Sequence, residues 1–269
     1  MDTLGYTVEL EDRKKISEPL LSKADRINVF FSLSDFKKKP GKKNLLVTDQ
    51  IEEKQVLNMA LRQEIHHVIQ NSMQSLEDKV QRLNNLSEDY RKYFHSHYNI
   101  LSDPELVKLF SIGPKDNRLT HIESIFKWLG LDMTSSRAQP MVQVIEELIM
   151  NAQITAPMQR QNVTPKSIDL RIEIKKDLIA ISAIDYYGTL GIDKFLKRIE
   201  NAFTVGLGQS INFGRGGAGL GSSIIYKYSE SIYLGCITEQ CTRVSIIMPY
   251  NKSEKVFSTI QKSIHVIKL

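Results

Sequence analysis

The chain has 269 residues, of which 41% are hydrophobic and 25% are charged, as is typical of a globular protein with a sizeable core. Its net charge of +5 comes from 36 basic and 31 acidic residues, and no basic block is long enough to predict a nucleic-acid-binding arm. Two cysteines, no apolar run of membrane-spanning length and no signal pattern predict a reduced, cytoplasmic protein without a membrane or nucleic-acid partner.

The sequence of residues 1–130 predicts a helix-rich region, which would sense a signal or form a dimer. Short strands are expected at 27–32 and 44–48, joined by a turn rich in Lys, Pro and Gly. Apolar residues then recur every three or four positions between 51 and 94, which predicts one long amphipathic helix, or two that break near Asn84. Such a stripe needs a partner, either this chain's own sheet or a second subunit, so a homodimer is one expectation.

Residues 131–269 alternate helices, strands and glycine-rich loops. They follow a helix expected over 119–129 and predict an α+β fold, a two-layer α/β sandwich whose antiparallel sheet carries helices on one face. The expected elements are a helix over 141–152, a hairpin of strands 168–174 and 178–184, a helix over 220–228 and a hairpin of strands 231–238 and 241–248.

Two polar features in this region point to nucleotide chemistry. Glu147 and Asn151 are four residues apart on a predicted helix and therefore share one face. A carboxylate can orient or deprotonate a nucleophile, and an amide oxygen is a suitable ligand for Mg²⁺. Asp185 ends a predicted strand just before Gly188, where a carboxylate can accept a hydrogen bond from the exocyclic amino group of adenine.

The third feature is a glycine-rich loop that leads directly into the predicted helix at 220–228. Unhindered backbone N–H groups at a helix N-terminus bind phosphates. No strand leads into this loop and no Gly-Lys-Ser/Thr sequence occurs, so it matches neither the dinucleotide fingerprint nor the Walker phosphate loop. The loop contains Gly216, Gly217, Ala218, Gly219, Leu220 and Gly221.

In this order and spacing, the three features resemble the ATP-binding domains of the GHKL superfamily, which have the Bergerat fold. The superfamily includes gyrases, heat-shock chaperones, histidine kinases and mismatch-repair ATPases, and the resemblance over residues 135–250 is to bacterial anti-sigma-like regulatory members. It implies that Glu147 is the general base, Asn151 the Mg²⁺ ligand and Asp185 the adenine acceptor. It further implies that the glycine loop wraps the phosphates of ATP, that Thr242 lies beside the adenine, and that 190–213 is a mobile lid.

The chain departs from the family pattern directly after Asp185. The usual Asp-x-Gly-x-Gly motif has Tyr187 and Thr189 at its two glycine positions, with Gly188 between them. A tyrosine beside the adenine would narrow the pocket.

A second resemblance lies upstream, at residues 64–74. This segment is similar to the phosphoacceptor helix of one histidine kinase class, and His67 falls on the phosphorylated position. A neutral imidazole is a good phosphoryl acceptor near pH 7. The alternative interpretation is an exposed helix histidine without chemistry.

The resemblance implies a bacterial signalling protein, of the kind found in two-component systems, that binds ATP and Mg²⁺. It would transfer the γ-phosphoryl group to a protein acceptor, either a serine of a partner protein or His67 itself. The competing hypothesis is a non-catalytic regulatory module, in which ATP or ADP orders the lid and a protein partner recognises it.

Overall fold

The computed structural model describes residues 27–30, 43–48, 53–61, 65–70, 76–160, 163–205 and 221–269. The strands of these residues are β1 (Ile27–Phe30), β2 (Lys43–Thr48), β3 (His67–Gln70), β4 (Leu106–Ile112), β5 (Ile168–Lys175), β6 (Leu178–Asp185), β7 (Ser231–Ile237), β8 (Cys241–Pro249) and β9 (Ser263–Lys268). The helices are α2 (Glu53–Leu61), α3 (Leu76–Glu88), η1 (Tyr90–Phe94), α4 (Arg118–Leu129), α5 (Gln139–Met150), η2 (Asn151–Thr155), α6 (Ala156–Met158), α7 (Ile192–Val205), α8 (Gly221–Tyr228) and α9 (Glu254–Phe257).

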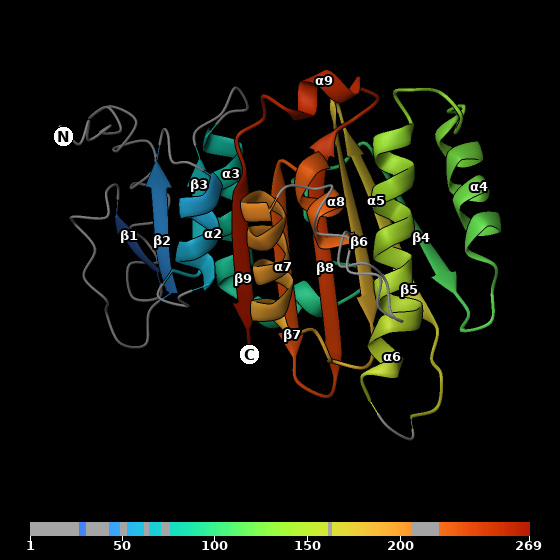
Figure 1. Cartoon of the computed structure of the whole chain (residues 1–269), viewed down its shortest axis with the longest axis horizontal. Coiled ribbons are helices and arrows are strands. Elements are labelled where there is room, and N and C mark those ends of the chain that lie inside the picture. The colour runs from blue at the N-terminus through green and yellow to red at the C-terminus, as the bar shows by residue number, and fades with distance from the viewer. Residues whose placement is uncertain are drawn as a thin grey trace.

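The described strands form one mixed sheet in the order β1-β2-β3-β9-β7-β8-β6-β5-β4 (Figure 1). Strands β1, β2 and β3 pair in parallel, as do β7 and β9, and the other neighbours are antiparallel. The sheet crosses the domain boundary expected at residue 130, because β3 pairs with β9 and β4 pairs with β5. The chain is therefore an α+β protein in which both predicted regions share one sheet.

The C-terminal predictions of secondary structure are confirmed, with small shifts of boundary. Helices α4, α5 and α8 form where they were expected, and the hairpins β5–β6 and β7–β8 are antiparallel. Strands β4 and β9 were not expected. Among the described residues, no helix combines the length and the apolar character that crossing a membrane requires.

The expected helix between 51 and 94 is wrong. The segment contains α2, then the buried strand β3, then α3 and η1. In β3, Val68 and Ile69 pack into separate hydrophobic clusters, as neighbours in a strand do. A short apolar run fits a buried strand as well as a helix, so periodicity alone could not separate the two. The apolar stripe also packs within the chain, through residues such as Leu57 and Leu83, and so no longer argues for a homodimer.

The two N-terminal strands were predicted correctly, but their connection was not. Strands β1 and β2 are parallel, with Ile27 opposite Lys43. Parallel neighbours need a crossover connection, which a tight turn cannot provide. The segment rich in Lys, Pro and Gly lies outside the described residues.

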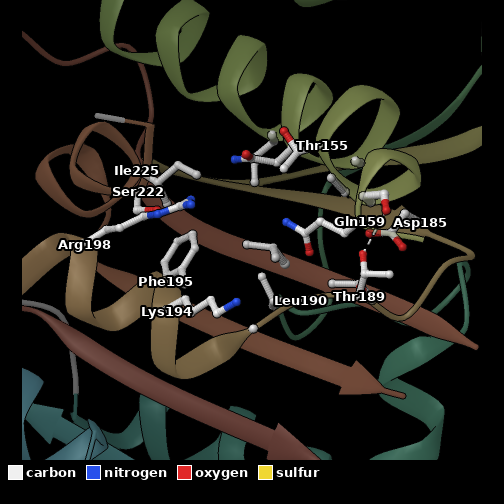
Figure 2. A pocket seen from close by; sticks show the side chains of 18 residues that line it. Thr155, Gln159, Asp185, Thr189, Leu190, Lys194, Phe195, Arg198, Ser222 and Ile225 are labelled. Carbon is white, nitrogen blue, oxygen red and sulfur yellow. Dashed lines mark hydrogen bonds between the residues drawn. The ribbon is translucent and has the colours of Figure 1, made fainter. Parts of the chain in front are cut away.

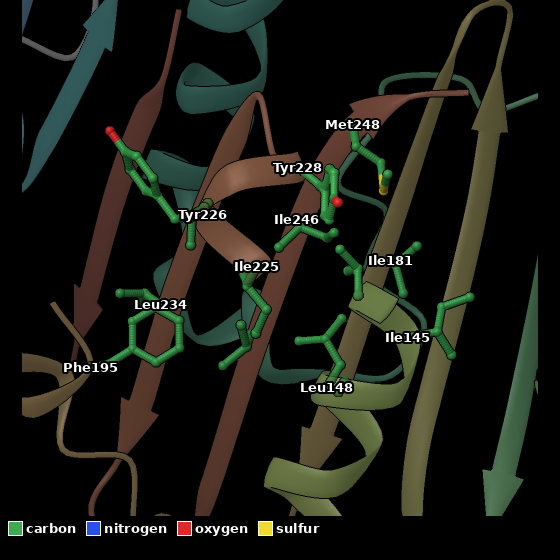
Figure 3. Packing of buried hydrophobic residues seen from close by; sticks show 14 of the residues in the cluster. Ile145, Leu148, Ile181, Phe195, Ile225, Tyr226, Tyr228, Leu234, Ile246 and Met248 are labelled. Atoms are coloured by element: carbon green, nitrogen blue, oxygen red, sulfur yellow. The ribbon is translucent and has the colours of Figure 1, made fainter. Parts of the chain in front are cut away.

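Helices cover both faces of the sheet, so the expected arrangement with helices on one face is wrong. The first hydrophobic cluster joins α2, α4, α5, α7 and α8 to one face (Figures 1 and 3). The second joins α3 and η1 to the opposite face. Along β6 and β8, residues alternate between the clusters, with Ile181 and Ile246 in the first and Ile184 and Ile247 in the second. Both strands are buried on both faces, because the sheet lies between helices.

Arg243 of β8 is a fully buried cation on the η1 face of the sheet. Its Nη1 donates hydrogen bonds to the carbonyl oxygens of Tyr93 at 2.7 Å and His95 at 2.8 Å, and its Nη2 donates to Tyr98 at 3.0 Å. Its Nε donates to Ser245 at 3.1 Å. These bonds hold η1 and the segment after it against the centre of the sheet.

His67 lies in β3 and has no exposed surface, so both interpretations of it as an exposed helix residue are wrong. It faces His265 of β9, with 3.3 Å between their Nδ1 atoms. His265 stacks on Tyr233 with ring centroids 4.3 Å apart, and Tyr90 contacts Nε2 of His67 at 3.2 Å. Burial lowers the pKa of His67 and lowers that of His265 to about 3, with the nearby cations Arg82 and Lys79 adding to the shift of His265. The pair is a neutral part of the core.

Acid should destabilise the protein through this pair. Between about pH 6.5 and 5 the unfolded chain protonates His265 but the folded chain does not, which costs about 1.4 kcal/mol of stability per pH unit. We expect His265→Gln to remove this part of the pH dependence of the free energy of unfolding, measured in urea at pH 7.5, 6 and 5. The same change at exposed His97 should leave the dependence as in the wild type. Parallel pH profiles for the wild type and His265→Gln would contradict the prediction.

Candidate functional site

A pocket lies on the face of the sheet that α5, α7 and α8 cover, beside the end of β6 and the start of β8 (Figure 2). Three residues that the sequence predicted, Asn151, Asp185 and Thr242, line it together. Asn151 comes from η2, and Asp185 and Thr242 pair directly across β6 and β8. Segments that are far apart in the sequence therefore meet at one site.

Asp185 is a buried carboxylate held by the turn that follows it, with 4% of its surface exposed. Its Oδ1 accepts hydrogen bonds from the backbone N–H groups of Tyr187 at 2.9 Å and Gly188 at 3.3 Å. Burial raises the pKa of Asp185 to about 6, and these two hydrogen bonds offset part of the rise. The pocket thus contains an oriented hydrogen-bond acceptor, the carboxylate of Asp185. It is ionised at neutral pH, and its ionisation lowers the stability of the fold.

Tyr187 does not narrow the pocket, contrary to the expectation from its position in the motif. It is not among the residues that line the pocket, and 1% of its surface is exposed. Its hydroxyl accepts a hydrogen bond from the backbone N–H of Lys166 at 2.6 Å. Thr189 does line the pocket, and its Oγ1 donates to the carbonyl oxygen of Ala156 at 3.2 Å (Figure 2).

Gly188 is required by backbone geometry rather than by contact with the pocket. Its φ is +62°, and a Cβ there would collide with the backbone of Ile237, Glu239 and Gln240 in the β7–β8 turn. The N–H of Glu239 donates to the carbonyl of Gly188 at 3.1 Å. Arg160 also joins the two turns, because it donates hydrogen bonds to the carbonyl oxygens of Tyr187 at 3.3 Å and Glu239 at 2.8 Å. The loop that orients Asp185 is therefore clamped onto the neighbouring turn.

Helix α5 continues into a single π-helical turn, η2, where the sequence predicted the last residues of a regular helix. Asn151, Ala152 and Thr155 of this turn line the pocket. The π-helical turn is rare and is often found at functional sites. Sequence periodicity does not reveal it, because its residues are ordinary helix formers.

Glu147 of α5 does not line the pocket. Its carboxylate lies beside the pocket, next to Gly221 at the start of α8. A Cβ at Gly221 would collide with the Glu147 carboxylate. The buried Oε2 of Glu147 has no hydrogen-bond partner in the part of the chain that the structure describes. Burial raises the pKa of Glu147, and Glu146 adds to the rise. A desolvated carboxylate beside a helix N-terminus can accept a proton from a group held there.

Most of the glycine loop, Gly216 to Leu220, lies outside the described residues, and Gly221 begins α8. The segment expected to be a mobile lid, 190–213, is helical over Ile192–Val205, and residues 206–213 are not described. Ile192, Phe195, Leu196 and Ile199 of α7 pack into the first hydrophobic cluster. The part of the expected lid that the structure describes is thus a packed helix.

Two cations that the sequence did not single out, Lys194 and Arg198 of α7, also line the pocket. In Figure 2, Arg198 lies near Ser222, and Asp185 lies on the far side of the pocket. The signal was present, because both residues flank the apolar stripe of α7 with helical spacing. A charged residue beside such a stripe is usually solvated, so the pattern alone did not single them out.

A scan against protein-family models and a search of curated proteins found no match to this chain. Among the described residues, no group of three or more His, Cys, Asp or Glu side chains could hold a metal ion. A Mg²⁺ ion at this pocket would therefore depend on Asn151 together with oxygens of its ligand and water, a mode of binding that is usual for this ion.

Alanine substitutions at Gly188 and Gly130 can be compared, because both glycines have a positive φ. The φ of Gly130 is +66°, but a Cβ added there would meet no atom within 4 Å. Gly130→Ala should cost about 1 kcal/mol, from backbone strain alone. Gly188→Ala adds a collision with the β7–β8 turn and should cost at least about 1–3 kcal/mol more. Urea unfolding of both variants measures the difference, and equal losses would contradict the clamp.

Proposed function

We propose that this protein binds ATP with Mg²⁺ in this pocket, in the manner of the GHKL superfamily, and transfers the γ-phosphoryl group to a protein acceptor in signalling. The observation that carries the proposal is the convergence of Asn151, Asp185 and Thr242 on one pocket. Each belongs to a different motif of the sequence. Their meeting supports a shared ligand better than any of the three motifs does alone.

The carboxylate end of the pocket suits an adenine base. Asp185 and Thr242 lie side by side in register at the strand ends. Around them the pocket has apolar walls, which match the faces of a planar base, and an acceptor for its amino group. The apolar walls include Leu148, Ala152, Ala183, Leu190, Ile225 and Val244.

The opposite end suits phosphates. Ser222, in the first turn of α8, lines the pocket, and a helix N-terminus attracts anions through its free N–H groups. Asn151 lines the pocket and would hold Mg²⁺, which when bound would neutralise charge on the phosphates. Glu147, whose carboxylate lies beside Gly221, would take the proton of an attacking hydroxyl group or water.

The acceptor is a group outside this core. His67, the internal candidate, is buried between β3 and β9 and packs against Tyr90, away from the pocket face of the sheet. A phosphoryl acceptor must approach the attacked phosphate in line, which a buried core residue cannot do. The proposal is therefore transfer to a hydroxyl group of a partner protein, with water as the alternative acceptor.

Calorimetric titration with ATP and Mg²⁺ tests the binding site. We expect the wild type to bind, and Asn151→Ala and Asp185→Asn each to weaken binding at least about 10-fold, because each removes a polar contact worth about 1.5 kcal/mol or more. Asp177→Asn makes the same chemical change on an exposed turn and should bind as the wild type does. Absence of binding to the wild type, or unchanged binding by both pocket variants, would contradict the proposal.

The stability of the Asp185→Asn variant shows whether a loss of binding comes from a folding defect. The folded chain holds the Asp185 proton more tightly than the unfolded chain. The stability of the fold therefore falls as the pH rises from about 4 to about 6, and the loss stays constant above that range. At pH 7.5 the neutral amide avoids this cost, and the variant should be more stable by about 1–3 kcal/mol. Loss of ATP binding in a more stable protein separates a binding role from a folding defect.

Glu147→Gln tests catalysis. It should keep ATP binding within a few-fold and slow turnover of radiolabelled ATP about 100-fold or more, because the amide cannot accept a proton. Glu123→Gln, the same change at an exposed position on α4, should leave turnover unchanged. If Glu147→Gln turns over ATP at the wild-type rate, Glu147 is not the general base. If the wild type binds ATP without turnover, the protein is instead a nucleotide-responsive regulatory module.

A further inference from the structure

Lys194 and Arg198 are four residues apart on α7 and both line the pocket. Their spacing places them on neighbouring turns of one helix face, about 6 Å apart at Cβ. Figure 2 shows Arg198 near Ser222 and Ile225, with Lys194 one turn closer to Leu190. Two cations therefore line the side of the pocket away from Asp185.

Neither cation forms a hydrogen bond or ion pair with another residue that the structure describes. Neighbouring charged groups are already engaged. Arg160 binds the carbonyl oxygens of Tyr187 and Glu239, and Lys166 binds the carbonyl oxygen of Tyr186. Asp193, which precedes Lys194, lies 3.6 Å from the ammonium group of Lys268.

Among the residues that the structure describes, the charged groups of the pocket wall are one carboxylate and two cations: Asp185, Lys194 and Arg198. The carboxylate and the cations occupy separate sides of the pocket (Figure 2). A ligand that matches this wall has an amino group or another donor at one end and at least two anionic groups, one for each cation, at the other. Adenosine has no anionic group, and AMP has only one phosphate for two cations.

We infer that Lys194 and Arg198 bind the polyphosphate of the nucleotide and make the site selective for ATP over AMP. This inference rests on the proposed function, which assigns the base to the Asp185 end. The guanidinium of Arg198 can donate two hydrogen bonds to one phosphate, and the ammonium of Lys194 acts as a point charge on the next. Selectivity for phosphate number then comes from α7, which the hydrophobic core holds in place through Phe195 and Ile199.

Calorimetry with ATP and with AMP, in Mg²⁺, tests this inference on the wild type, Lys194→Gln and Arg198→Gln. We expect the wild type to bind ATP much more tightly than AMP. Each variant should lose about 10- to 100-fold in affinity for ATP but only a few-fold for AMP, because AMP lacks the further phosphates to which these cations donate. Lys197→Gln, a change on the same helix at an exposed position outside the pocket wall, should match the wild type.

The outcomes separate the two proposals. If the wild type binds ATP and both variants keep the wild-type ratio of ATP to AMP affinity, the role of α7 is wrong and the proposed function stands. Equal losses for ATP and AMP would likewise overturn the selectivity. If the wild type binds neither nucleotide, the proposed function itself fails.

Discussion

The pocket depends on the register between β6 and β8. Asp185 and Thr242 face each other only because the two strands pair as they do, and a slip of one residue would turn every side chain of β8 to the other face. Arg243 opposes such a slip. Its buried guanidinium is satisfied by carbonyl oxygens on the η1 face, and on the pocket face it would lose them. The hydrogen bonds of a buried arginine on one face of the sheet thus maintain the binding site on the other.

The same pocket has costs that folding alone does not explain. Asp185 is ionised at neutral pH although burial raises its pKa to about 6, Glu147 has an unpaired buried oxygen in the described chain, and α5 ends in a π-helical turn. Costs of this kind gather where a protein binds or transforms a ligand. The meeting of these three features at one pocket is a physical reason, independent of any motif, to place a function there.

The sequence predicted the parts of the site whose signals are local. A helix repeat places Glu147 and Asn151 on one face, and strand alternation places Asp185 at a strand end. It did not predict Lys194 and Arg198, because their role depends on which side of α7 the sheet covers. It misplaced His67, because a four-residue buried strand between two helices preserves the helical spacing of apolar residues. Tyr187 was misjudged for a similar reason, since the direction of its ring depends on its contact with Lys166.

We propose that a nucleotide occupies this pocket with its base at Asp185 and its phosphates between α7 and α8. A crystal structure of the protein grown with Mg²⁺ and a non-hydrolysable ATP analogue tests it most directly. We predict that the adenine amino group lies within hydrogen-bonding distance of the Asp185 carboxylate, with the phosphates near Ser222 and Arg198. An empty pocket at saturating analogue, or a nucleotide bound elsewhere or in the reverse orientation, would contradict the account.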